Sequence, residues 1–157
     1  MKRIMPPTYF MVLLALSILL NFFFPLMKFY YFPYNYIGAL LIIFGIFLNL
    51  KADSMFTKSK TTVKPHLIPS SFEVSGPFRI SRHPMYLGMF LILFGAALIM
   101  GSLITFVFPF LFVILMEILF IPKEERNMEK AFGKKYLAYK KKVRRWIWFC
   151  LNLTIIQ

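Results

Sequence analysis

Residues 85–121 read MYLGMFLILFGAALIMGSLITFVFPFLFVILMEILFI, and this stretch decides the fold. It consists of two apolar blocks, residues 85–100 and 103–121, which are separated only by Gly101 and Ser102. Neither block alternates strictly between apolar and polar residues, so strands of a membrane barrel are not indicated. At 1.5 Å per residue, each block forms a helix about 24–28 Å long, close to the thickness of a hydrocarbon core. The sequence therefore predicts a tight helical hairpin in a membrane.

Two further apolar blocks, residues 9–24 and 34–50, precede this hairpin. The whole chain of 157 residues is 59% apolar and only 16% charged, which excludes a soluble globular domain. No small-x-small cleavage site follows Phe24, so the first block is expected to remain as a helix rather than to be removed as a signal peptide. We therefore expect an all-α membrane protein of about four transmembrane helices that form a single domain, residues 1–157.

The charge of the chain is strongly basic, with 19 Lys and Arg against 6 Asp and Glu, a net charge of +13. The basic residues lie between and after the apolar blocks, which indicates an anionic membrane face as the partner rather than nucleic acid. The positive-inside rule places residues 51–83 and both termini in the cytoplasm. We expect a multi-pass protein of the cytoplasmic membrane of a prokaryote. With Cys150 as the single cysteine, neither a disulfide nor a metal site is expected.

The tail, residues 124–146, carries apolar residues in steps of three and four, and its other faces are rich in lysine and arginine. This pattern predicts a C-terminal amphipathic cytoplasmic helix that lies on an anionic leaflet. Gly133 is expected to mark a bend in it. The apolar positions are Met128, Phe132, Tyr136, Tyr139, Val143 and Trp146.

Two blocks share a spacing of glycines, because Gly38 and Gly45 in one and Gly88 and Gly95 in the other are seven residues apart. Residues seven apart lie on one face of a helix, where glycines let a neighbouring backbone approach closely. The pattern indicates helix packing, and we attach no function to it.

Polar residues cluster at two places that are both predicted to be cytoplasmic. The first contains Arg82 and His83, just before the hairpin, and the second is the pair Glu124 and Glu125 just after it. The two clusters can therefore meet in one cleft. Glu117 lies inside the last apolar block, where an acid is costly and is by default a functional candidate. Two readings of Glu117 stay open: a functional group, or a structural residue that pairs with Arg82 or a tail lysine or reaches the interface from near the helix end.

Several short motifs, in order and with sensible spacing over residues 58–146, together resemble the isoprenylcysteine carboxyl methyltransferase and phospholipid methyltransferase superfamily of integral membrane enzymes. Each motif alone is weak, and their combination is specific. They are Thr61-Thr62-Val63-Lys64-Pro65, Val74-Ser75-Gly76-Pro77-Phe78-Arg79, Arg82-His83-Pro84-Met85-Tyr86-Leu87-Gly88, Glu124-Glu125, Phe132-Gly133, Tyr136, Tyr139 and Val143.

The resemblance implies a methyltransferase that uses S-adenosylmethionine and methylates a lipophilic acceptor from the bilayer. An aromatic face and a carboxylate suit a sulfonium cation, carboxylates accept from ribose hydroxyls, and arginine suits the cofactor's carboxylate. If the acceptor must lose a proton, His83 or Glu117 is the candidate catalytic residue. The residues that the resemblance assigns to the cofactor are His66, Leu67, Arg82, His83, Pro84, Tyr86, Glu124 and Glu125.

One position departs from the pattern of the enzymes that methylate prenylated protein ends. The enzymes that this chain otherwise resembles carry an arginine about one helical turn before the key glutamate. This chain has Phe120 at that position, followed by Pro122 and Lys123. An ammonium lacks the bidentate fork of a guanidinium, so the substitution argues against a prenylcysteine carboxylate as the acceptor. Two other functions stay open: a membrane reductase that uses a nicotinamide cofactor, and a non-enzymatic scaffold whose basic tail binds lipid.

Overall fold

The computed structural model describes residues 5–24, 35–58 and 74–146, and this part of the chain is helical without a strand. The predicted all-α membrane fold is confirmed. The elements are α1 (Pro6–Phe23), α2 (Asn35–Lys58), the 3-10 helix η1 (Gly76–Arg79), α3 (Pro84–Met100), the 3-10 helix η2 (Leu103–Phe106), α4 (Val107–Leu119), α5 (Ile121–Phe132) and α6 (Lys134–Lys142).

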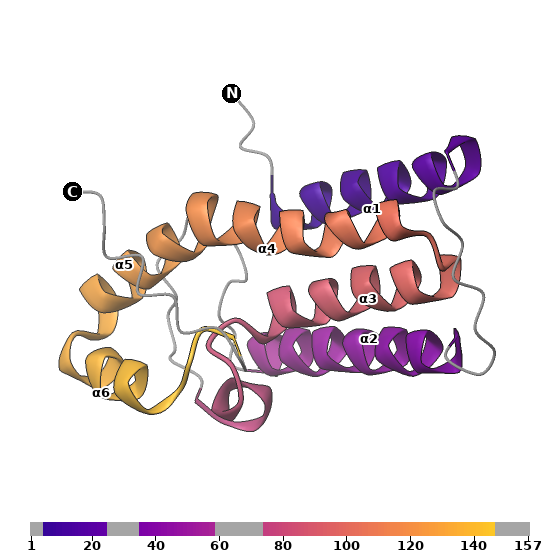
Figure 1. Cartoon of the computed structure of the whole chain (residues 1–157). Helices are drawn as coiled ribbons and strands as arrows, with labels where there is room; N and C mark the ends of the chain where they lie inside the picture. The colour runs from indigo at the N-terminus through magenta and orange to yellow at the C-terminus, as the bar shows by residue number, and fades with distance from the viewer. Residues whose placement is uncertain (1–4, 25–34, 59–73, 147–157) are drawn as a thin grey trace.

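Four long helices lie side by side, with α1 against α4 and α2 against α3 (Figure 1). Helices α2 and α4 run in the opposite direction to α1 and α3, so the starts of α1 and α3 and the ends of α2 and α4 share one end of the bundle (Figure 1). Helices α5 and α6 extend from that same end. The predicted cytoplasmic segments are thus together in space, and the side of the membrane on which they lie stays a prediction.

The contact between α2 and α3 is a close backbone approach at the glycines that the sequence singled out. A Cβ built on Gly45 would lie 2.6 Å from the carbonyl oxygen of Gly88, and one built on Gly38 would lie 2.6 Å from that of Gly95. Both distances are shorter than any real Cβ contact. The two helices therefore pack with no side chain between them at these crossings, as small residues allow in membrane helices.

The predicted hairpin joint is confirmed at Gly101 and Ser102. Gly101 adopts the left-handed conformation, with φ of 62°, and its N–H donates to the carbonyl of Ala97 at 2.9 Å, which ends α3. After it, the hydroxyl of Thr105 donates to the carbonyl of Ser102 at 2.6 Å and helps to shape η2. The chain then reverses into α4, and Phe94 packs edge-on against Phe110 across the hairpin.

The last apolar block, predicted as one helix over residues 103–121, is divided in the structure. It begins with η2, continues as α4 and breaks at Phe120, after which α5 starts at an angle of 41°. Pro122 lies in the first turn of α5 and cannot donate a backbone hydrogen bond to the preceding turn, so the helix must break before it. The break turns the acidic start of α5 away from the axis of α4.

The tail is also divided, which corrects the prediction of one helix over residues 124–146. Helix α5 starts earlier, at Ile121, and ends at Gly133, whose positive φ of 49° is accessible to glycine and unfavourable for other residues. Helix α6 follows and ends at Lys142, and residues 143–146 leave it with Val143 extended. The predicted bend at Gly133 is thus a complete break between two helices. The apolar stripe also packs inward, because Tyr136 and Trp146 are buried within the protein.

Within the described ranges, two helices, α1 and α2, are long and apolar enough to cross a membrane, and η2–α4 with α5 would be a third if the bent pair is one span. Their outward faces are apolar, with Phe22 78% and Leu40 66% exposed, as lipid-facing surfaces are. Helix α3 is apolar but has 17 residues, fewer than a typical span. Helix α2 also continues past the predicted residue 50 to Lys58. The count of four spans stays a prediction.

The glycine crossing gives a direct test of the packing. We expect Gly45→Val to destabilise the protein by about 1–3 kcal/mol, because the added methyl groups overlap the backbone of α3. Leu40→Val, on the lipid-facing side of α2, is the matched control and should change stability little. Thermal unfolding in detergent measures both. Equal midpoints for the two variants would contradict the close approach of α2 and α3.

Candidate active site

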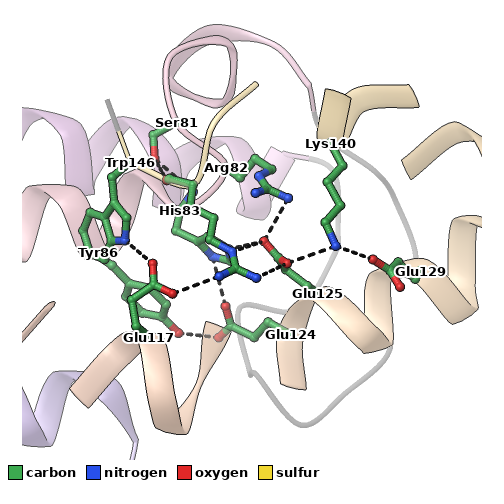
Figure 2. Close-up of polar contacts among 11 residues, drawn as sticks. Ser81, Arg82, His83, Tyr86, Glu117, Glu124, Glu125, Glu129, Lys140 and Trp146 are labelled. Carbon is green, nitrogen blue, oxygen red and sulfur yellow. Dashed lines mark hydrogen bonds and ion pairs between the residues drawn. The ribbon is translucent and has the colours of Figure 1, made fainter. Parts of the chain in front are cut away.

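The site is built where the start of α3 meets the start of α5. Pro84 opens α3, where its missing N–H removes no helical hydrogen bond, and His83 precedes it as the N-cap residue. The His83 side chain makes no capping hydrogen bond to the helix, so it is available for other partners. Its backbone N–H is held by the hydroxyl of Ser81 at 3.1 Å. Figure 2 shows His83 pointing toward Glu124 and Glu125 of α5.

Glu125 is the centre of the cluster, with a side chain only 3% exposed (Figure 2). Arg145 binds it with two nitrogens, Nε to Oε1 at 3.0 Å and Nη2 to Oε2 at 2.9 Å. Nη1 of Arg82 lies 2.9 Å from Oε1, and Nζ of Lys140 lies 3.4 Å from Oε2. A buried carboxylate is tolerated only with such compensation, and here three cations from separate segments supply it.

Glu124, one residue earlier, faces the aromatic side of the site. Its Oε2 lies 3.2 Å from Nδ1 of His83, and its Oε1 accepts a hydrogen bond from the hydroxyl of Tyr86. The rings of His83 and Tyr86 are nearly parallel, with an interplanar angle of 8°. The Glu124 side chain is 20% exposed, so it is the more open of the two carboxylates.

Charge and burial act in opposite directions on the two central groups. Burial alone would lower the pKa of His83, but the hydrogen bond with Glu124 and the negative charges of Glu124 and Glu125 raise it above its ordinary value of 6.5. Burial alone would raise the pKa of Glu125, but the hydrogen bonds with Arg145 and the positive charges of Arg82 and His83 hold it far below its usual range. Both shifts favour the charged forms, an imidazolium on His83 beside an ionised Glu125.

Three buried nitrogens of the site have no hydrogen-bond partner among the described residues: Nε2 of His83, and Nε and Nη1 of Arg82, of which Nη1 only pairs by charge with Glu125. Nε2 of His83 lies 3.8 Å from Glu125, beyond hydrogen-bond distance. A pocket of about 270 Å³ opens at Glu125, and neither Arg82 nor His83 is among the residues that line it. Orphaned donors next to carboxylates fit a ligand that carries both an anionic group and hydroxyl or ammonium groups. The pocket is lined by Glu117, Pro122, Glu125, Arg126, Glu129, Lys140 and Arg145.

Among the described residues, no group of three His, Cys, Asp or Glu side chains is placed to hold a metal ion. The polar groups instead suit an organic molecule. Arginine and histidine donors recognise a carboxylate, and the glutamates accept from hydroxyl groups or pair with a cation.

The structure brings together most of the residues that the sequence singled out. Arg82, His83, Tyr86, Glu124 and Glu125 are in mutual contact, with Pro84 setting the start of their helix. His66 and Leu67 lie outside the described residues.

Glu117 contacts a tail arginine rather than Arg82 or a tail lysine. Its Oε2 accepts from Nη1 of Arg145 at 3.0 Å, and its Oε1 accepts from Nε1 of Trp146 at 2.6 Å. Arg145 and Trp146 are site residues that were not predicted, because the helical pattern of the tail places them on a lipid-facing helix. The sequence does contain a signal for these residues, because an unusual tryptophan directly follows a pair of arginines. The helical pattern of the tail obscured this signal.

A comparison with protein families finds a match to the model of the phospholipid methyltransferase family over residues 33–135, more than half of the chain. The chain belongs to this family. The match includes α2, the hairpin, α5 and the beginning of α6, so it contains Arg82, His83 and both central glutamates. The resemblance predicted from the short motifs is thereby confirmed.

One curated relative of this family member is a protein from Haemophilus influenzae described as an uncharacterized protein. It is 36% identical over 63 residues, which make up 40% of this chain and 100% of the relative. No solved structure matches the chain. Family membership makes the chain a membrane methyltransferase in general, and its cofactor and acceptor are taken up below.

The pKa shifts predict how stability depends on pH. Because the pKa of folded His83 is raised above 6.5, its stabilising contribution is complete below pH 6.5 and is lost as pH rises through the folded value. Because the pKa of Glu125 is lowered from 4.5, its contribution is present above pH 4.5 and is lost at acid pH. We expect the highest stability between these two values.

Thermal unfolding at about pH 5.5 and about pH 8.5 tests the alkaline limb, where the midpoint should fall. His83→Gln, which cannot titrate, should have a smaller fall over the same interval. An equal fall in both proteins would show that His83 is not the group responsible.

Proposed function

We propose that this protein transfers a methyl group from S-adenosylmethionine to a lipophilic acceptor that enters from the bilayer. The observation that carries the proposal is the juxtaposition of orphaned donors on Arg82 and His83 with the carboxylates of Glu124 and Glu125. An amino acid end with both charges and a ribose with two hydroxyls would satisfy these groups. When bound, S-adenosylmethionine supplies a methyl group on a sulfonium, which is electrophilic.

The residues of the chain then have distinct roles. Arg82 and His83 donate to the cofactor's carboxylate, and Glu124, the more exposed acid, accepts from a ribose hydroxyl. Tyr86 is buried near the start of α3, where its ring stacks on His83 and its hydroxyl donates to Glu124, so we assign it the role of holding these two side chains in place. Methyl transfer is an in-line displacement, so positioning the two substrates and excluding water supply most of the catalysis.

The acceptor is expected to be a lipid-soluble molecule, since the site lies where apolar helices end. At Phe120, the ring is 7% exposed and packs edge-on against Tyr9, with centroids 5.6 Å apart. Phe120 thus makes an aromatic core contact at the position where, by the resemblance, enzymes acting on prenylated protein ends carry an arginine. This supports a different acceptor from a prenylcysteine carboxylate. An amine or hydroxyl acceptor must lose a proton, and the proposed proton acceptor is then His83 in its neutral form rather than Glu117, whose two carboxylate oxygens are engaged by Arg145 and Trp146.

Calorimetric titration of the detergent-purified protein with S-adenosylmethionine, and with S-adenosylhomocysteine, tests the cofactor. We expect micromolar binding by the wild type. Glu124→Gln should weaken binding at least about tenfold, because hydrogen bonds to charged groups contribute about 1.5–3 kcal/mol. Asp53→Asn, an exposed acid on α2, is the matched control and should bind like the wild type.

The absence of binding by a folded wild-type sample would contradict the proposal. Reduced nicotinamide is titrated in the same series, because its binding in place of S-adenosylmethionine would favour the reductase. If S-adenosylmethionine binds, incubation with its methyl-labelled form and a lipid extract, followed by extraction into organic solvent, identifies the acceptor fraction.

We further propose that the site faces the cytoplasm of a prokaryotic cell and that the tail rests electrostatically against anionic lipid. The exposed basic side chains of α5, α6 and the residues after them support this. The apolar residues Tyr136 and Trp146 of the tail are buried inside the protein and do not face lipid. The contact with lipid is therefore one of charge, worth about 1 kcal/mol per basic residue near an anionic leaflet. These basic residues are Lys123, Arg126, Lys130, Lys134, Lys135, Lys141, Lys142 and Arg144.

The lipid contact is tested by reconstitution into neutral and into anionic bilayers. We expect the lysines of α6 to be acetylated more slowly in the anionic bilayer, with the difference disappearing near 1 M salt, where the Debye length is about 3 Å. Mass spectrometry of peptides containing Lys134, Lys135, Lys141 and Lys142 gives the rates. Equal rates in both bilayers at low salt would count against contact with lipid.

A further inference from the structure

Residues 143–146, which we call the strap, return from the end of α6 to the start of α3. The backbone of the strap is held at two places: the N–H of Arg82 donates to the carbonyl of Arg144 at 2.9 Å, and the hydroxyl of Ser81 donates to the carbonyl of Arg145 at 2.6 Å. Ser81 also holds the N–H of His83. The strap is therefore attached directly to the segment that carries the orphaned donors of the site.

The indole of Trp146, at the end of the strap, points toward Glu117 (Figure 2). Trp146 is fully buried, with 0% exposure, and its indole N–H donates to Oε1 of Glu117 at 2.6 Å. Nη1 of Arg145 donates to Oε2 of Glu117 at 3.0 Å. Each carboxylate oxygen of Glu117 is thus engaged by a residue of the strap, and the Glu117 side chain is only 8% exposed.

Arg145 connects Glu117 to the centre of the site. Its Nη1 binds Glu117, and its Nε and Nη2 bind the two oxygens of Glu125. A guanidinium is planar and rigid, so fixing one of its edges on Glu117 fixes the direction from which its other edge meets Glu125. Nη1 of Arg82 lies 2.9 Å from Oε1 of Glu125. The orientation of Arg145 therefore also affects that of Arg82, the arginine proposed to bind the cofactor.

We propose that Glu117 is a positioning residue: it anchors the strap through Trp146 and, through Arg145, sets the orientation of Glu125 and Arg82 for binding the cofactor. This inference rests on the proposed function. It gives Glu117 a different role from that of a proton acceptor, because both of its oxygens face the strap. It also adds Arg145 and Trp146 to the site as residues that act through others.

The attachment of the strap is tested by tryptophan fluorescence, which needs no cofactor. The chain has two tryptophans, Trp146 and Trp148, so Trp148→Phe leaves Trp146 as the sole reporter. In this background we expect blue-shifted emission and weak quenching by acrylamide. Glu117→Ala should shift the emission to the red and increase quenching, because the strap loses its anchor. Asp53→Ala, an exposed acid elsewhere, is the matched control and should change neither.

The role in the reaction is tested by separating binding from turnover. For Glu117→Ala we expect the Kd for S-adenosylmethionine to rise about tenfold or more, as loss of a charged hydrogen bond predicts, with kcat at saturation changed much less. If Glu117 is instead the proton acceptor, kcat falls about 10²–10⁴-fold with little change in Kd. That second result would overturn the proposal.

Conservative variants keep the test decisive if Glu117→Ala does not fold. Glu117→Gln retains an acceptor for the indole N–H but loses the charge that holds Arg145, so Trp146 should stay buried while the Kd rises. Arg145→Lys keeps the positive charge but loses the bidentate geometry of the guanidinium, so Trp146 should again stay buried while the Kd rises. Unchanged Kd in both folded variants would overturn the proposal.

The two proposals fail in different ways. If the wild type does not bind S-adenosylmethionine, the proposed function fails and the role of Glu117 in cofactor binding fails with it, whatever the fluorescence shows. If the wild type binds and Glu117→Ala changes neither fluorescence nor Kd, the proposed function stands and only the positioning role is overturned.

Discussion

A carboxylate that is 3% exposed must be surrounded by cations or hydrogen-bond donors, and Glu125 takes them from three separate segments of the chain. Arg82 comes from the residues before α3, Lys140 from α6 and Arg145 from the strap. Each of these segments is held in place partly by its bond to Glu125. Removing the acid would leave three positive side chains close together, so the site and the fold of the tail depend on the same charge.

The helices provide the frame that brings these segments together. The close approach of α2 and α3 at their glycines aligns the end of α2 with the start of α3. The tight turn at Gly101 then returns α4 to the same end, and Pro122 breaks the helix so that α5 presents Glu124 and Glu125 to His83. A straight continuation of α4 would carry the two acids along its axis, away from the start of α3. The glycine contacts of α2 and α3, the turn at Gly101 and the break before Pro122 together bring the two polar clusters into contact.

Much of this arrangement follows from local sequence patterns. The apolar blocks predicted the helices, and the glycine spacing predicted close helix packing at those residues, although not which helices would meet. The positions of Arg82, His83, Glu124 and Glu125 predicted that two polar clusters could meet in one site. The break at Phe120 was missed, although Pro122 is a local signal, because the apolar run continues through it to Ile121. The number of membrane spans does not follow from length alone, since α3 is short and α4 is bent into α5.

The strap could not be predicted, for a physical reason. Its pattern of basic and apolar residues continues that of α6, and helical periodicity cannot show that the chain becomes extended at Val143. Trp146 fitted the apolar stripe of a lipid-facing helix, but its burial and its bond to Glu117 depend on tertiary contacts with a residue 29 positions earlier. Contacts over such separations leave no periodic signal in the sequence.

The pairing of Glu117 with Arg145 and Trp146 also has a consequence for biosynthesis. A ribosome that has completed α4 has yet to synthesise the strap, so Glu117 emerges before either of its partners exists. An acid at the centre of a membrane helix costs about 2.5–3.5 kcal/mol on insertion scales, and the cost falls toward the helix end. Glu117 lies near the end of α4, where it can stay in contact with headgroups or water until the tail is made. The polar site therefore cannot be completed before Arg145 and Trp146 have been synthesised.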